Sequence, residues 1–139
     1  MLSHCFVGVN DFPRGLRFYQ AVMAALGYEQ RFIEAARPWA GWQAPGQPRP
    51  LFLIGLPENG EAAAPGNGQM AALLAPTRAA VAAAHAAGLA NGGSDAGAPG
   101  LRPQYHANYF GAYLRDPDGN KIGIVCHEMQ PFQGEGHLQ

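Results

Sequence analysis

The chain has 139 residues, 47% of them hydrophobic, and a formal net charge of -1. This length suits one compact domain, or two small halves that share a core. The nearly balanced charge gives no general attraction to nucleic acid, and no run of about 20 apolar residues is present to span a membrane. Because no basic segment followed by an apolar one opens the chain, we expect no signal peptide and a cytoplasmic location.

The two cysteines, Cys5 and Cys126, both lie inside apolar runs. Buried free thiols are the ordinary state of such residues in a cytosolic protein. The sequence leaves undecided whether a disulfide joins them, because it does not show whether the two sulfur atoms meet.

The first half of the chain opens with a short apolar segment and continues with a helical pattern. Residues 2–9, "LSHCFVGV", predict a strand. Asn10 or Asp11 provides a helix cap, and apolar residues then recur at helical spacing until Gly27, which is suited to end the helix. Further strands are predicted at 28–35, 38–44 and 50–56.

The second half repeats this order after a linker at 58–67 that is rich in Pro, Gly and Asn. Thr77 can cap an Ala-rich helix, and the segment "NGGSDAGAPG" that follows is interpreted as a glycine-rich loop. The tail from Gln130 is expected to be poorly ordered. The predicted strands of this half lie at 69–75, 101–105, 107–115 and 120–127.

The order βαβββ therefore occurs twice, which predicts an α+β protein built from two modules, residues 1–57 and 68–128, with a flexible tail at 129–139. Each sheet would carry a helix on one face and need cover on the other. We expect the two modules to form a curved mixed sheet around a central cleft, the usual place for a small ligand. The sequence does not distinguish a cleft within one chain from one that a second chain completes.

The opening "SHCFVGVNDFPRGLRFYQAVMAALGY", the hairpin "YLRDPDGNKIGI" and the repeated βαβββ order are the most distinctive features of the sequence. Together they resemble the vicinal-oxygen-chelate superfamily, which includes glyoxalase I, extradiol dioxygenases and bleomycin-resistance proteins. The resemblance covers about residues 1–127. It implies the fold more directly than the function, because one fold hosts many chemistries.

The resemblance also implies where a metal would be held. The ligand positions of metal-dependent members match His4 in the first strand, Met70 at the start of the second half, and Gly123 after the hairpin turn. A catalytic metal normally needs about three protein ligands, and only His4 retains one that suits Zn, Ni or Fe(II). We therefore expect no metal cofactor, unless His106 or His127 rebuilds the site.

Strand alternation indicates which side chains would face the cleft. For Trp42, packing in the core or at a dimer surface stays open as an alternative. Mostly apolar and aromatic walls with a few polar tips suit a small organic molecule. The predicted ligand-binding residues are His4, Phe6, Trp42, Met70, Leu74, His106, Tyr109, Tyr113, Gly123 and Val125.

The leading hypothesis is a metal-independent protein that binds a small aromatic or amphipathic molecule in the cleft. One alternative is a metal-free lyase or isomerase in which His4 and Tyr113 act as catalytic acid and base. Another is a glyoxalase- or dioxygenase-type metal enzyme with relocated ligands, and a further one is a role that the sequence does not reveal. We expect a homodimer, because the edge strand of each half must be covered or paired, and neither a nucleic acid nor a membrane as partner.

Overall fold

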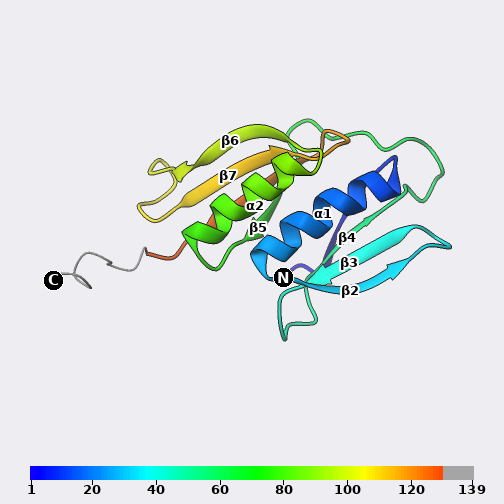
Figure 1. The fold of residues 1–139 in the computed structure, drawn as a ribbon, viewed down its shortest axis with the longest axis horizontal. Helices are drawn as coiled ribbons and strands as arrows, with labels where there is room; N and C mark the ends of the chain where they lie inside the picture. The colour runs from blue at the N-terminus through cyan, green and yellow to red at the C-terminus, as the bar shows by residue number, and fades with distance from the viewer. Residues whose placement is uncertain (130–139) are drawn as a thin grey trace.

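A computed structural model describes residues 1–129, and its elements confirm the doubled βαβββ order (Figure 1). Within the described residues, neither helix has the length and hydropathy needed to cross a membrane. The first module contains β1 (His4–Gly8), α1 (Phe12–Leu26), β2 (Glu29–Glu34), β3 (Trp39–Gln43) and β4 (Leu51–Gly55). The second contains β5 (Ala71–Leu74), α2 (Arg78–Ala90), β6 (Ser94–Leu101), β7 (Phe110–Arg115) and β8 (Lys121–Cys126).

Both helices begin at the caps that the sequence predicts. The Asp11 carboxylate accepts a hydrogen bond from the backbone N–H of Arg14, and the Thr77 hydroxyl accepts one from the N–H of Ala80. Each bond satisfies a donor that the first helical turn leaves free. Gly27 ends α1 with φ of 80°, a left-handed conformation that glycine adopts without steric cost.

The strands form two four-stranded mixed sheets of the same topology. Sheet 1 has the order β1-β4-β3-β2, and sheet 2 has the order β5-β8-β7-β6. In each module the first strand pairs in parallel with the last strand, and the other neighbours are antiparallel. The α+β class and the two modules are therefore confirmed, and the two sheets do not join into one closed sheet.

Strand β6 corrects the prediction of a glycine-rich loop at residues 91–100 and a short strand near 101–105. It runs along the edge of sheet 2 and pairs only with β7, with register shifts on both sides of Gly97. A Cβ atom at Gly97 would lie 2.8 Å from Cδ2 of Tyr113, so this glycine allows a close contact inside a strand. The predicted tail from Gln130 lies outside the described residues.

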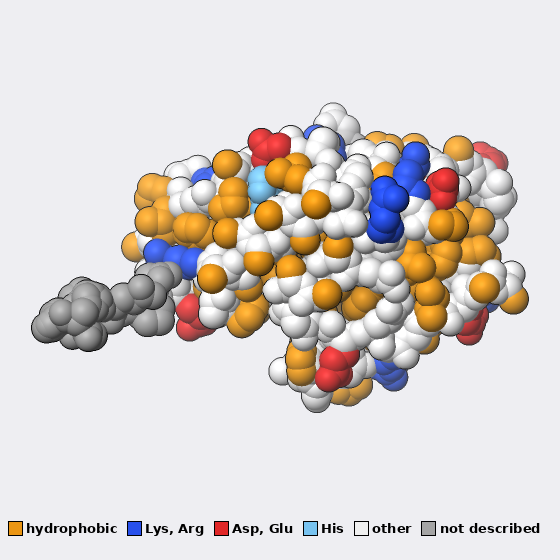
Figure 2. All heavy atoms as spheres, in the orientation of Figure 1, with side chains coloured by type: hydrophobic (Ala, Val, Ile, Leu, Met, Phe, Trp, Pro, Cys, Tyr) orange, Lys and Arg blue, Asp and Glu red, His pale blue; other side chains and the backbone are white. Residues whose placement is uncertain are grey.

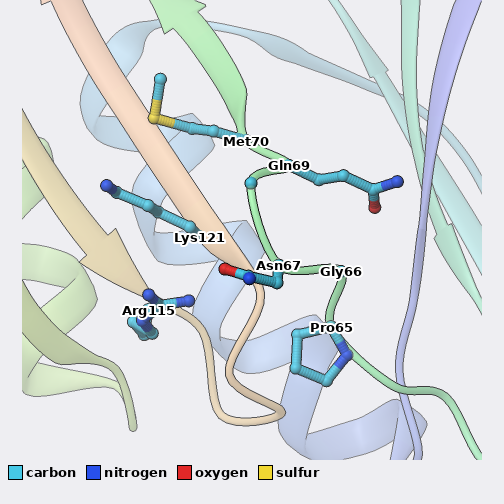
Figure 3. Close-up of a pocket in the computed structure, with 8 residues that line it drawn as sticks. Pro65, Gly66, Asn67, Gln69, Met70, Arg115 and Lys121 are labelled. Carbon is cyan, nitrogen blue, oxygen red and sulfur yellow. The ribbon is translucent and has the colours of Figure 1, made fainter.

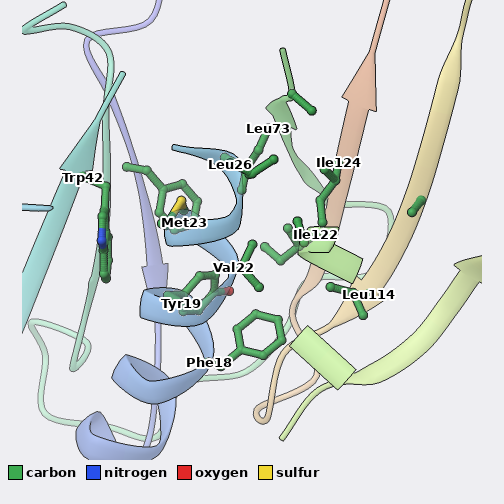
Figure 4. Close-up of a cluster of buried hydrophobic side chains, with 14 of the residues drawn as sticks. Phe18, Tyr19, Val22, Met23, Leu26, Trp42, Leu73, Leu114, Ile122 and Ile124 are labelled. Atoms are coloured by element: carbon green, nitrogen blue, oxygen red, sulfur yellow. The ribbon is translucent and has the colours of Figure 1, made fainter. Parts of the chain in front are cut away.

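One hydrophobic core serves both modules, and helix α1 lies at its centre. The core cluster includes buried side chains from both helices and both sheets. Figure 4 shows Trp42 of β3 on one side of α1, and Ile122 and Ile124 of β8 on the other side. Cys5 is half-buried and Cys126 is buried, and both are free thiols.

This arrangement turns the uncovered faces of the two sheets away from α1. The inner face of each sheet packs on the helices, so its opposite face is the one that a ligand can reach. We call these surfaces the outer face of sheet 1 and the outer face of sheet 2. Because α1 lies between the sheets, the two outer faces of one chain do not face each other across a cleft.

The close packing of α2 depends on Gly88. A Cβ atom at this position would lie 2.5 Å from Cδ1 of Leu114 and 3.1 Å from a ring carbon of Phe18. Both neighbours are fully buried, so they have little room to move. The missing side chain therefore lets α2 approach α1 and β7 at the same time.

Gly88→Ala is expected to destabilise the protein although alanine is the better helix former. The overpacking cost of about 1–3 kcal/mol outweighs a helix-propensity gain of about 1 kcal/mol. In a Leu114→Ala background the closest clash is absent and the contact with Phe18 remains, so the same substitution should cost clearly less. Urea unfolding of the four variants measures this coupling, and an equal cost of Gly88→Ala in both backgrounds would contradict it.

Candidate functional site

The outer face of sheet 1 is built from aromatic side chains that lie over glycines. A Cβ atom at Gly41 would meet a ring carbon of Phe32 at 2.5 Å and Cδ2 of Leu53 at 2.7 Å. At Gly55 it would meet Cβ of Trp39 at 3.0 Å and the ring of Phe6 at 3.2 Å. The rings of Phe32 and Trp39 pack edge to face with 4.6 Å between their centroids. The glycines thus leave a shallow apolar floor.

The outer face of sheet 2 repeats this design with tyrosines. The ring of Tyr109 lies 2.9 Å from a Cβ position at Gly111, and the ring of Tyr113 lies 3.3 Å from one at Gly123. The hydroxyl groups of Tyr109 and Tyr113 are 2.8 Å apart and share a hydrogen bond. The two phenols therefore form a polar pair on an otherwise flat surface.

Most of the predicted cleft residues lie on these two outer faces. His4 and Phe6 project from β1, where Phe6 is 46% exposed, and the alternate residues Cys5 and Val7 pack on the core. On sheet 2, Met70 and Leu74 are 45% and 63% exposed. Val125 of β8 lies opposite Gly111 of β7 and therefore belongs to the same outer face, but it is almost fully buried.

Trp42 is the exception, because the structure places it in the core. It is 2% exposed, and its ring centroid lies 6.5 Å from that of Tyr19 on α1. The other tryptophan of β3, Trp39, belongs to the outer face. Small residues lie on both sides of this strand, Ala40 inside and Gly41 outside, so small neighbours did not indicate the outer side. The placement of Trp42 in the cleft is therefore corrected.

His106 and His127 meet outside the strands, near the tyrosine pair. Nε2 of His106 lies 2.8 Å from Nδ1 of His127, and the rings stack with centroids 5.1 Å apart. The Nδ1 atom of His106 accepts a hydrogen bond from the backbone N–H of Asn108. Its Nε2 atom must then carry the proton in the neutral ring and donate to His127. This arrangement leaves neither facing nitrogen ready for a metal without breaking a hydrogen bond.

A hollow lies where the chain enters β5, next to Lys121, whose ammonium nitrogen lies 5.5 Å from the centre of the Tyr113 ring. It has a volume of about 560 Å³ and is lined by residues 65–70 together with Arg115 and Lys121. Figure 3 shows the side chains of Met70, Lys121, Arg115 and Asn67 around it. A second hollow of about 300 Å³ lies next to it, between β1 and the start of β5.

Comparison with known proteins identifies the family. The model of the family described as "Glyoxalase/Bleomycin resistance protein/Dioxygenase superfamily" matches residues 1–124. The chain belongs to this superfamily. No curated protein matches the sequence.

Solved structures from the superfamily agree with this assignment. A glyoxalase/bleomycin resistance protein from Albidiferax ferrireducens T118 is 37% identical, with a TM-score of 0.78 over 91% of this chain and 98% of that one. A glyoxalase-related enzyme from Fulvimarina pelagi is 21% identical, with a TM-score of 0.66 over 91% of this chain and 87% of that one. A family enzyme from Burkholderia phytofirmans PsJN is also 21% identical, with a TM-score of 0.65 over 91% and 98% of the two chains. At 21% identity the likeness shows the fold alone.

The residues at the superfamily's metal positions do not fit a divalent metal. Gly123 offers no ligand, and a Cβ atom there would already meet Sδ of Met70 at 3.2 Å and the ring of Tyr113 at 3.3 Å. The thioether of Met70 is a soft ligand that suits Cu(I) rather than Zn, Mn or Fe(II). Within residues 1–129, no three His, Cys, Asp or Glu side chains gather closely enough to hold a metal ion.

The glycines of the outer faces shape the candidate site, and the sequence analysis did not single them out. Gly41, Gly55 and Gly111 fall within strands that the sequence predicts, and Gly97 falls in the segment interpreted as a loop. Glycine inside a strand often marks a place where another group approaches closely. Glycines inside predicted strands, at positions 41, 55 and 111, are the signal that could have indicated this flat floor.

Tyr113 is a hydrogen-bond donor rather than a base. Burial, together with the hydrogen bond to Tyr109, raises its pKa to about 12, against the opposing effect of Arg102 and Lys121. A raised pKa means that the folded protein disfavours the phenolate form. At neutral pH the Tyr113 hydroxyl therefore keeps its proton, and because the two hydroxyls share one hydrogen bond, one proton of the tyrosine pair stays free for a ligand oxygen.

Tyr113→Phe should leave the phenolate absorbance of the protein almost unchanged at about pH 10, where an ordinary tyrosine is half ionised. Tyr109→Phe removes a hydrogen bond that raises the pKa of Tyr113, so it should allow Tyr113 to ionise at lower pH. Ultraviolet titration of the three proteins measures this. A clear loss of phenolate signal in Tyr113→Phe at that pH would show that Tyr113 titrates normally.

Proposed function

We propose that this protein binds a small aromatic or amphipathic molecule without the help of a metal. The single observation behind this proposal is that Gly123 stands at the family's carboxylate position. The side chains of Met70 and Tyr113 fill the space beside it, in place of the carboxylate that metal-dependent members carry. An aromatic and thioether surface there favours contact with an apolar ligand.

We further propose that two copies of the chain form the binding cleft. The two outer faces of one chain point away from α1, but they have the same topology and the same pattern of rings over glycines. The outer face of sheet 1 in one copy can therefore meet the outer face of sheet 2 in the other. A twofold axis would create two equal clefts and cover the exposed side chains of Phe6 and Leu74.

A metal-free lyase or isomerase is the second candidate, and one contact favours it. The Ser3 hydroxyl lies 2.9 Å from Nδ1 of His4, which gives this imidazole an orienting partner. In a two-chain cleft, His4 of one copy would act beside Tyr113 of the other. Tyr113 could serve only as the acid, because its raised pKa prevents it from acting as a base near neutral pH.

Metal content provides the first test. After incubation with Ni, Zn, Mn or Fe(II) and gel filtration, the protein should retain no stoichiometric metal, because only one imidazole remains at the family positions. The control is His4→Ala, measured in parallel. Stoichiometric metal that is lost in His4→Ala would overturn the metal-independent proposal.

Ligand binding provides the second test. Small aromatic compounds should raise the melting temperature, and Tyr113→Phe should weaken that shift by removing a hydrogen bond worth about 0.5–1.5 kcal/mol. Trp42→Phe is the matched aromatic control, because Trp42 lies in the core and should leave the ligand-induced shift unchanged. An equal loss of the ligand-induced shift in Tyr113→Phe and Trp42→Phe would show that the ligand does not bind at Tyr113.

Mixing two inactive variants tests the two-chain cleft. Phe6→Arg alters the outer face of sheet 1, and Leu74→Arg alters that of sheet 2, so each homodimer should lose binding. A heterodimer of the two variants contains one cleft with two intact faces, and mixing should restore up to half of the sites per dimer. No recovery in a heterodimer confirmed by mass spectrometry would place the cleft within one chain.

A further inference from the structure

Two cations lie over the ring of Tyr113 on the outer face of sheet 2, and a third follows Tyr113 on the same face of β7. The guanidinium carbon of Arg102 lies 5.6 Å from the centre of the Tyr113 ring, and the ammonium nitrogen of Lys121 lies 5.5 Å from it. Arg115 is the next outer-face residue after Tyr113 on β7. Among the described residues, none of the three lies within salt-bridge distance of a carboxylate.

The nearest carboxylates of the hairpin are already engaged with the first module. Asp116 accepts from the hydroxyl of Tyr19, and Asp118 accepts from Arg14 at 2.8 Å. Asp95 on β6 bonds His85 of α2 and therefore faces the helix side. Figure 2 shows the helix side with scattered charges of both signs. The positive charge around Tyr113 is thus locally uncompensated.

The pairing of Arg115 with Lys121 makes this charge costly. The two residues lie directly opposite each other in the antiparallel β7–β8 pair, so their side chains share the outer face. Like charges at such a position repel each other. Arg115 donates one hydrogen bond to the carbonyl of Gly119, which fixes the guanidinium without neutralising it. A bound anion would relieve the repulsion and gain two charged contacts.

The hollow of about 560 Å³ next to these cations has the size of a small-ligand pocket. Arg115 and Lys121 lie on one side of it and Asn67 lies near them, whereas the Gln69 side chain points away from the two cations (Figure 3). The side-chain amide of Asn67 adds a neutral donor. Met70 lines the same hollow, and its Sδ atom and the Tyr113 ring lie 3.2 and 3.3 Å from one Cβ position at Gly123, so a charged head group and an apolar body can be accommodated together.

We propose that this hollow binds the anionic group, a carboxylate or a phosphate, of an organic ligand whose aromatic or apolar body lies on the tyrosine floor. Arg115 and Lys121 are the specificity-determining residues. The inference rests on the proposed binding function and defines its ligand class: organic anions are preferred, and organic cations are excluded by repulsion.

Three matched probes test the charge of the ligand: 3-phenylpropionate, its neutral amide and 3-phenylpropylamine. Calorimetry at low ionic strength should show the carboxylate binding about 10- to 100-fold more tightly than the amide, as expected for a charged hydrogen bond, and the amine not at all. Arg115→Gln and Lys121→Gln should each remove most of this preference. Arg17→Gln, which removes one cation from the exposed side of α1, is the matched control and should keep it.

Melting temperatures show whether the variants fold. Without ligand, Lys121→Gln should melt no lower than the wild type, because it relieves the repulsion with Arg115. Inorganic phosphate should raise the melting temperature of the wild type and of Arg17→Gln, but not that of Lys121→Gln. An equal rise in Lys121→Gln would overturn the assignment of these cations.

The outcomes separate this inference from the proposed function. Equal affinity for the carboxylate and the amide would overturn the anion site and leave aromatic binding intact. Binding of inorganic phosphate with no gain from the phenyl group would support the anion site and overturn the aromatic cleft. Tighter binding of the amine, or no binding of any probe, would overturn the anion site.

Discussion

A buried carboxylate, Asp116, connects the two modules, and the geometry of the candidate site depends on it. It is 4% exposed and accepts hydrogen bonds from the backbone N–H groups of Asp118 and Asn120, which shape the turn between β7 and β8. Its other oxygen accepts from the hydroxyl of Tyr19 on α1 at 2.7 Å. Asn120 also donates to the carbonyl of Gly8 at the end of β1. The hairpin that carries Tyr113, Arg115 and Lys121 is thus fixed to the first helix and the first strand.

This connection explains why α1 lies between the two sheets. Burial and the neighbouring Asp116 charge raise the pKa of Tyr19 well above its usual value, so the phenol keeps the proton that it donates. Phe18 and Val22 on the same helix pack against Gly88 of α2, which admits them because it has no side chain. The helices therefore fill the space between the sheets, and the ligand-accessible surface moves to the two outer faces.

The sequence predicted the parts of the fold that depend on local chemistry. Asp11, Thr77 and Gly27 act at helix ends through contacts within a few residues, and the placement of His4 and Phe6 follows from strand alternation. The predicted cleft position of Trp42 and the predicted loop in place of β6 were wrong, because tertiary contacts determine both. Ala40 and Gly41 leave space on both sides of β3, and only the position of α1 determines which side is inner. In β6, the glycines that resemble a loop are spaces for the Tyr113 ring and for a register shift.

Several properties of the candidate site follow from the absence of a side chain at Gly123. A carboxylate there would need the space that Met70 and the Tyr113 ring now occupy. Its absence removes a metal ligand, and it also removes a negative charge that would have neutralised Lys121 and Arg102 beside the same ring. The ring can then lie flat on the sheet, where burial keeps its hydroxyl protonated. The same change that disfavours a metal therefore leaves an aromatic floor, a neutral donor and cations that have no carboxylate partner within residues 1–129, a combination suited to an organic anion.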